Sequence, residues 1–111
     1  MHISFKNKRL ERSITDPKDL VKTYGIQRAK KIKQRYLEMK ASATLEALSK
    51  IPATRLHQLS GDRAGQWAVS ITGNERLCFV ILHDPIPTLP DNSVNRSEVT
   101  DICIVFIGDY H

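Results

Sequence analysis

The spacing of the apolar residues changes near residue 50, and this change limits the folds that the chain can adopt. Between residues 26 and 40, apolar side chains recur at intervals of three or four, which is the period of an amphipathic helix. After Pro52, the runs QWAVSIT, RLCFVIL and DICIVFI are rich in β-branched, aromatic and other apolar residues, which favour strands. We therefore expect an α+β domain in which two to three helices pack on a mainly antiparallel sheet of about four to five strands.

Local signals indicate where these elements begin and end. HISF at residues 2–5 is a candidate first strand, and RLHQL is a candidate strand after the helices. Asp16 as N-cap, Pro17 at the first helical position and Gly25 as C-terminal cap predict a short helix. The stretch SATLEALSK predicts a last helical segment with Ser42 as its N-cap.

A hairpin turn is predicted between the second and third strands of the C-terminal half. Gly73 and Asn74 both tolerate positive φ angles, and this pair is typical of a two-residue turn. In that register Ile71 would pair with Arg76, at the mouth of the hairpin.

The length of the chain fits one compact domain, which we expect to span residues 1–111. Residues 83–100 include three prolines and predict a long loop inserted between the last two strands. No apolar run approaches the roughly 20 residues of a membrane span, and the first residues lack the apolar core of a signal peptide. We therefore expect a cytoplasmic protein with no membrane partner.

The cysteines and histidines give no sign of a metal site. Cys78 and Cys103 lie in strand-like runs without CxxC spacing, so we expect buried, reduced thiols. The four histidines show no paired spacing with these cysteines. The sequence also lacks a GxSxG elbow, a glycine-rich phosphate loop and an HExxH motif. We expect no metal and no other cofactor.

Charge is distributed unevenly along the chain. Residues 1–60 carry 14 Lys+Arg against 5 Asp+Glu, whereas residues 61–111 carry 3 against 7. The positive charge therefore belongs to the helical half. Such a face attracts phosphate backbones without reading sequence, although a charged helix face is more often simply solvated.

Residues capable of acid–base or phosphate chemistry occur at strand ends and turns in the C-terminal half: His57, Arg63, Arg76, Asp109, Tyr110 and His111. Antiparallel strands can bring such positions to one rim of a sheet. Two imidazoles, a phenol and guanidinium groups suit cleavage of RNA by its own 2′-hydroxyl, because histidine can act as base or acid and arginine can hold the phosphate. Each residue also has an ordinary structural explanation, as a strand-edge side chain or as part of a chain end.

The strand half resembles a known toxin family. The segment LHQLSGDRAGQWAVSITGNERLCF is similar to the pattern L-x-x-L-x-G-x-x-x-G-x-W-S-I-x-x-N-x-x-R-x-x-F of the HigB toxins in the RelE/ParE superfamily. The closing GDYH resembles the terminal DYH of that family, and the opening ISFKNKRLE is similar to its N-terminal strand and turn. The resemblance implies a RelE-like fold.

The resemblance also implies a function. A HigB-type protein is the toxin of a type II toxin–antitoxin system, of the kind that maintains plasmids, and it is a ribosome-dependent mRNA endonuclease (mRNA interferase). It cleaves the codon in the ribosomal 30S A site without metal and so inhibits translation. Its implied partners are the ribosome with its mRNA, a helix-turn-helix antitoxin (HigA-like), and operator DNA bound through the antitoxin complex.

The resemblance assigns roles to individual residues. Arg76 matches the arginine that stabilises the scissile phosphate, and His111, Tyr110 and Asp109 match the active-site tail. His57 matches a histidine that some members have and others lack. The assignment of base and acid between His57 and His111 stays open.

Further residues would bind RNA. Ser60 stands where some relatives carry a lysine, so phosphate binding near this position would come from Arg55 or Arg63. The ribosome contacts would be lysines of the basic helix: Lys30, Lys31 and Lys33. The acidic 83–100 loop, which is longer than the family's turn, is expected to project away from the ribosome.

Two other functions compete with the nuclease. A ParE-like member would bind DNA gyrase and cleave no RNA, and such proteins are not expected to end in DYH. An inactive remnant would bind only the antitoxin and operator DNA. Growth arrest with intact mRNA would indicate the gyrase inhibitor, and absence of a growth phenotype would indicate the remnant.

Overall fold

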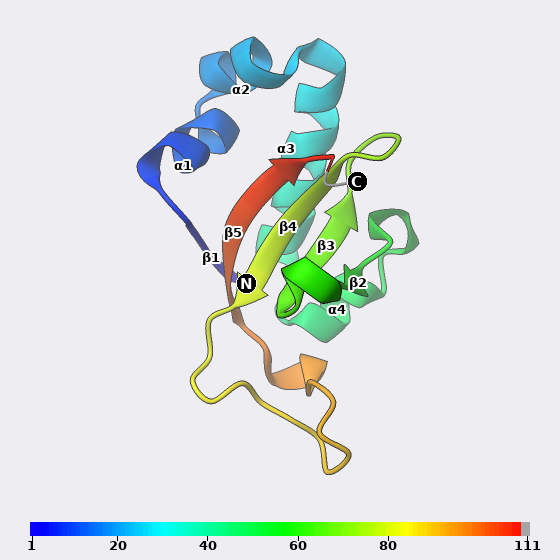
Figure 1. Ribbon diagram of the computed structural model, residues 1–111. Coiled ribbons are helices and arrows are strands. Elements are labelled where there is room, and N and C mark those ends of the chain that lie inside the picture. Colours follow the sequence, from blue (N-terminus) through cyan, green and yellow to red (C-terminus); the bar gives the residue numbers. More distant parts are fainter. Residues whose placement is uncertain (110–111) are drawn as a thin grey trace.

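The computed structural model describes residues 1–109 and has two layers, a five-stranded sheet and a group of helices (Figure 1). The strands are β1 (His2–Phe5), β2 (His57–Gln58), β3 (Gln66–Ser70), β4 (Arg76–Ile81) and β5 (Asp101–Gly108). Their order in the sheet is β1-β5-β4-β3-β2. β1 runs parallel to β5, and the other neighbouring pairs are antiparallel. The predicted α+β class is confirmed.

Four α-helices lie within the described part of the chain: α1 (Lys8–Thr15), α2 (Pro17–Tyr24), α3 (Ile26–Ala41) and α4 (Leu45–Ser49). The prediction for α2 is confirmed, because the Asp16 side chain accepts hydrogen bonds from the backbone amides of Lys18 and Asp19. Gly25 joins α2 directly to α3 and has a φ of 80°, which glycine adopts without strain.

Helix α1 was not predicted, so the expected number of two to three helices was too low. Its sequence KRLERSIT contains few apolar residues, and its start depends on Asn7, whose side chain accepts a hydrogen bond from the Leu10 amide at 2.8 Å. The predicted cap of α4 was also wrong. Thr44 caps α4, while the Ser42 hydroxyl donates to the Glu38 carbonyl at the end of α3.

The core lies between α3 and one face of the sheet. Ile32 and Met39 of α3 are fully buried, and they belong to one apolar cluster with Val69 of β3 and Leu77 and Phe79 of β4. Figure 1 shows α3 behind the strands. Burying one such side chain contributes about 1.5–3 kcal/mol, so this packing fixes the sheet on the helix.

A buried arginine ties α3 to the end of β3. Arg35 is 4% exposed, and its Nε donates to the Ser70 carbonyl at 2.7 Å. Its two terminal nitrogens donate to the Ala53 carbonyl and to a Glu38 carboxylate oxygen, both at 2.9 Å. Arg35 therefore holds the strand end at which Ser70 pairs with Arg76.

The hairpin between β3 and β4 differs from the predicted one. Ser70, rather than Ile71, pairs with Arg76. The Ile71 amide donates to the Glu75 carbonyl at 3.0 Å, and the turn closes by a bond from the Glu75 amide to the Thr72 carbonyl at 2.8 Å. The loop is thus one residue longer than predicted. A register shift of one residue moves a side chain to the other face of the sheet relative to the paired strand. Arg76 therefore shares a face with Ser70, and it does not share the face of the buried Ile71.

The connection between β4 and β5 is a long projecting arm, as Figure 1 shows. It contains an isolated bridge between Thr88 and Val94, and Arg96 forms an ion pair with Glu46 of α4 at 2.9 Å. Because β4 begins at Arg76 and the arm follows its other end, the arm leaves the sheet at the opposite end from that arginine. The predicted strand RLHQL is shorter than expected, since β2 contains only two residues. No helix within residues 1–109 has both the length and the apolar character to cross a membrane.

Candidate functional site

The second face of the sheet, which α3 does not cover, carries three of the residues that the sequence singled out: His57, Arg63 and Arg76. We call it the open face. His57 pairs with Ala68, Ala68 with Cys78, and Cys78 with Phe106, so these four residues form one row across four strands. Residues directly opposite in a sheet lie on the same face. The row therefore places His57 on the face that Cys78 and Phe106 share.

A second row on the open face contains Arg76. Arg76 pairs with Ser70 on one side and with Gly108 on the other. Two strand spacings of about 4.8 Å and two residues of rise at about 3.3 Å separate the Cα atoms of His57 and Arg76 by about 12 Å. Long side chains and a substrate can bridge that distance.

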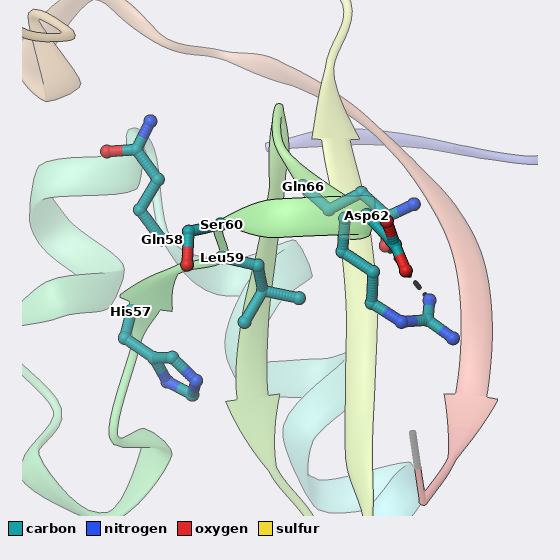
Figure 2. Close-up of a pocket in the computed structure, with 7 residues that line it drawn as sticks. His57, Gln58, Leu59, Ser60, Asp62 and Gln66 are labelled. Atoms are coloured by element: carbon teal, nitrogen blue, oxygen red, sulfur yellow. Dashed lines mark hydrogen bonds between the residues drawn. The ribbon is translucent and has the colours of Figure 1, made fainter. Parts of the chain in front are cut away.

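The segment between β2 and β3 lies over the first row. Ala68 and Cys78 are fully buried although α3 is on the other side of the sheet. Figure 2 shows the short 3₁₀ helix Gly61–Arg63 crossing in front of β3 and β4. The guanidinium carbon of Arg63 lies 4.3 Å from the centre of the Phe106 ring, which is a cation–π contact. This contact and a bond from Arg63 Nη1 to Gln66 Oε1 at 3.2 Å hold the guanidinium over the open face.

A pocket of about 680 Å³ lies beside this segment (Figure 2). Its lining is polar apart from one leucine: His57, Gln58, Leu59, Ser60, Asp62, Arg63 and Gln66. His57 Nδ1 lies 2.8 Å from the Arg55 carbonyl oxygen, which can only accept a hydrogen bond. In the neutral imidazole the proton is therefore on Nδ1, and the basic lone pair is on Nε2.

Arg76 is half-buried at the start of β4. Its Nη1 donates to the carbonyl oxygens of Gly73 at 2.9 Å and Glu75 at 3.0 Å. The Glu75 carboxylate in turn accepts from Arg28 of α3 at 2.6 Å, so an ion pair anchors the hairpin loop on the helical layer. One edge of the Arg76 guanidinium is thus fixed by the turn, which orients the remaining N–H groups.

The end of β5 approaches Arg76 through a glycine. Gly108 has a φ of 151°, and a Cβ atom at this position would lie 3.0 Å from the Phe106 ring. Glycine therefore allows β5 to continue directly beside Arg76. Asp109 follows and is exposed.

The Cys78 thiol is buried on the open face, close enough to Arg63 and Arg76 for their charges to affect its pKa. Burial raises the pKa of Cys78, and the positive charges of Arg63 and Arg76 partly oppose that rise. A thiol with a raised pKa carries little thiolate at neutral pH, so Cys78 is a poor nucleophile. The same pair of charges is well placed for a phosphate.

The structure brings some of the predicted site residues together and separates others. His57, Ser60 and Arg63 line one pocket, and Arg76 lies in the next row of the open face. Arg55 is exposed and does not line that pocket; its contribution is the carbonyl that binds His57. Tyr110 and His111 lie outside the described residues, so their predicted roles stay predictions. The predicted ribosome contacts are exposed on α3, in the other layer: Lys30, Lys31 and Lys33.

Sequence reasoning missed several residues of the site. Gln66 and Phe106 position Arg63, and Arg28 anchors the Arg76 loop. Alternation within DICIVFIG would place Phe106 on the core face with Ile102 and Ile104, since every second residue of a strand shares a face. The register shift between Cys78 and Phe79 moves Phe106 to the open face, and no sequence signal indicated it.

The unpredicted helix α1 brings a second group of cations to the protein surface. Lys6, Arg9, Arg12 and Lys22 line a concavity of about 630 Å³ beside the end of β5. This concavity is separate from the pocket that His57 lines. Within residues 1–109, no group of three or more His, Cys, Asp or Glu side chains is arranged to hold a metal ion.

Comparison with known proteins identifies the fold. No protein-family model matches the sequence, and no curated protein shows a significant sequence match. Among solved structures, the chain is similar to one described as a YoeB/ParE toxin from Agrobacterium tumefaciens. The superposition covers 100% of this chain and 100% of that chain, with a TM-score of 0.54 and 13% sequence identity.

That likeness confirms the predicted toxin-like fold, because it extends over both chains from end to end. The superposition supports a shared fold, and a sequence identity of 13% does not by itself transfer an activity. The HigB subtype stays a prediction.

Proposed function

We propose that this chain is a type II toxin that cleaves mRNA on the ribosome. The observation that carries the proposal is the position of Arg76, which is anchored on the open face directly beside the end of β5. Gly108, the first residue of the GDYH segment, pairs directly with Arg76, and the HigB resemblance pairs that arginine with the residues of this segment. Arg63 and His57 approach the same face from the neighbouring pocket.

The proposed reaction uses the RNA itself as nucleophile. A base removes the proton of the 2′-hydroxyl, the 2′-oxygen attacks the adjacent phosphorus, and the 5′-oxygen leaves with a proton from an acid. The products are a 2′,3′-cyclic phosphate and a 5′-hydroxyl. His57 and His111 are the proposed proton carriers, and His57 would act through Nε2 because its Nδ1 is held by the Arg55 carbonyl.

Arginine would stabilise the charge that develops on the phosphate. The turn carbonyls fix Arg76 before substrate binds, and preorganised donors of this kind are typically worth roughly 10²–10³ in rate. Arg63 adds a second cation on the same face. Tyr110 and Asp109 would complete the site as hydrogen-bonding groups of the tail, and no step of this mechanism calls for a metal.

The proposed partners follow from the same function. The toxin would bind the ribosomal A site, with Lys30, Lys31 and Lys33 of α3 as its rRNA contacts. A HigA-like antitoxin would neutralise it in the cytoplasm and join it to operator DNA. Phosphate contacts release counterions, so ribosome binding should weaken steeply with salt.

The test is cleavage of a defined mRNA on purified ribosomes in the presence of EDTA, with the new 5′ ends mapped. The native chain should cut at codon-spaced positions, and both Arg76→Ala and a chain that lacks His111 should lose the cuts. Arg96→Ala is the matched control, because Arg96 pairs with Glu46 on the arm side of the sheet. Absence of cutting by the native chain, despite ribosome binding, would overturn the proposal.

A gyrase inhibitor is the second candidate, since the similar solved structure is described by the names of both YoeB and ParE. Under that function the native chain would stop growth while mRNA stays intact, and it would inhibit supercoiling by purified gyrase. Arg76→Ala would then keep its toxicity.

A further inference from the structure

The concavity of about 630 Å³ beside the end of β5 has a structural cause, and we call it the α1 concavity. β1 ends at Phe5, opposite Ile104, whereas β5 continues to Gly108. Beyond Phe5 the chain leaves the sheet and enters α1, so no other strand of residues 1–109 covers this side of the last part of β5. α1 and α2 stand beside β5 there (Figure 1). Together these elements line a space of the size that small ligands occupy.

One part of this lining is cationic. Four of its side chains are positively charged: Lys6, Arg9, Arg12 and Lys22. Asp19 is the acid of the lining, which therefore has a net charge of +3 at neutral pH. None of the four cations takes part in an ion pair among residues 1–109. Uncompensated cations around one concavity attract phosphate groups, and arginine can donate two parallel hydrogen bonds to them.

The other part of the lining is apolar and aromatic. It consists of Leu10, Tyr24, Val105, Phe106 and Ile107. All five are half-buried, so each keeps some accessible surface. Aromatic and apolar side chains bind nucleobases by stacking and burial. The α1 concavity thus offers one surface to phosphates and another to a base.

The hydroxyl of Tyr24 adds a polar contact with a defined direction. Ser13 Oγ donates to the Leu10 carbonyl at 2.8 Å, so the single proton of this hydroxyl is engaged. The Tyr24 hydroxyl lies 3.0 Å from Ser13 Oγ and is therefore the donor in that bond. The Tyr24 oxygen is left as an acceptor, which suits an N–H group of a base.

Phe106 joins the α1 concavity to the open face. Its ring lines the concavity and also carries the Arg63 guanidinium, 4.3 Å from the ring centre. Gly108, two residues further along β5, pairs with Arg76. The concavity therefore adjoins the open face, although it is separate from the pocket that His57 lines.

We propose that the α1 concavity is a nucleotide-binding site. Its cations would hold the phosphate groups, while its apolar wall and the Tyr24 oxygen would hold the base. Two sources supply this chemistry: a free nucleoside triphosphate, and a nucleotide of an RNA strand that continues past the open face. The site goes beyond the nuclease function, because nucleotide binding here requires no cleavage.

The first experiment titrates the full chain with ATP, inorganic triphosphate and adenosine by isothermal titration calorimetry, without divalent cations. ATP should bind at least about tenfold more tightly than either fragment, since only ATP reaches both parts of the lining. Equal binding of ATP and inorganic triphosphate would indicate nonspecific attraction of anions and would overturn the proposal.

Arg9 and Lys8 provide a matched pair of variants. Both are exposed on α1, but Arg9 lines the concavity, whereas Lys8 does not and pairs with Glu11 at 3.6 Å. Arg9→Glu should weaken ATP binding at least about tenfold, and Lys8→Glu no more than about threefold, although both change the charge equally. Equal effects of the two variants would overturn the assignment to this concavity.

Tyr24→Phe tests the contact with the base. ATP binding should weaken by about two- to tenfold, because one hydrogen bond is lost, while binding of inorganic triphosphate should stay unchanged. Thermal unfolding checks the fold, since this variant also loses the bond to Ser13. An equal loss for both ligands would reject the contact between Tyr24 and the base.

A second titration distinguishes the two sources, with a single-stranded RNA of about six nucleotides in place of ATP. If the site serves RNA, the oligonucleotide should bind more tightly than ATP and depend on Arg9 in the same way. Arg9→Glu should then raise the ribosome concentration that half-saturates mRNA cleavage, with little change in the maximal rate. Tighter binding of ATP than of RNA would assign the site to a free nucleotide.

The same measurements separate this proposal from the nuclease. If ATP binding depends on Arg9 and the native chain cuts no mRNA, the nucleotide site stands and the nuclease proposal fails. If the native chain cuts mRNA and neither ATP nor RNA binding depends on Arg9, the nuclease stands and the nucleotide site is overturned.

Discussion

Replacement of the buried Arg35 by methionine should destabilise the protein by about 3–5 kcal/mol. The variant keeps a long apolar side chain but removes the donors to the Ser70 and Ala53 carbonyls and the partner of Glu38. Hydrogen bonds to a charged group are worth about 1.5–3 kcal/mol each, and removing one member of a buried ion pair costs about 3–5 kcal/mol. A small domain is stable by only about 5–15 kcal/mol, so this loss is a large fraction of the total.

The assay is unfolding in urea and by heat, followed by circular dichroism. The midpoint temperature should fall by roughly 12–30 °C, at about 4–6 °C per kcal/mol for a domain of this size. Arg96→Met is the matched control, because Arg96 forms a partly exposed ion pair with Glu46, and ion pairs near the surface contribute about 0–1 kcal/mol. If Arg35→Met loses less than about 1 kcal/mol, like its control, the assigned role of Arg35 in holding β3 to α3 is refuted.

Three further changes test the site. Gly108→Ala places a Cβ atom 3.0 Å from the Phe106 ring at a φ of 151°. The free energy of unfolding in urea should fall by about 1–3 kcal/mol and mRNA cleavage should decrease. Unchanged stability would contradict the close approach. Burial raises the pKa of Cys78, so at pH 8 a smaller fraction of this thiol is ionised than in an ordinary cysteine. Iodoacetamide at pH 8 should therefore label Cys103 before Cys78 in a mass-spectrometric time course. Arg76→Lys keeps the charge but loses the planar pair of donors, so cleavage at saturating ribosomes should fall roughly 10²-fold with stability nearly unchanged, and full activity would reject the phosphate role.

The fold class could be predicted because local signals and the apolar pattern agree along most of the chain. Asp16, Pro17 and Gly25 mark the ends of α2, and the apolar runs of β3, β4 and β5 match their burial. Helix α1 escaped prediction because its packing, mainly against α2 and also against β1 and α3, rather than its composition, decides its formation. Asn7 indicates the start of a helix, but the polar sequence that follows it shows too few apolar residues to predict one.

The hairpin register shows why the site was harder to predict than the fold. A Gly-Asn pair is compatible with both a two-residue and a three-residue loop, and the choice depends on contacts far along the chain. Arg35 holds the Ser70 carbonyl, and Arg28 holds the Glu75 side chain, so α3 constrains both sides of the turn. These contacts set the face on which Arg76 lies. Residue types therefore indicated the chemistry of the site, while long-range contacts determined its geometry.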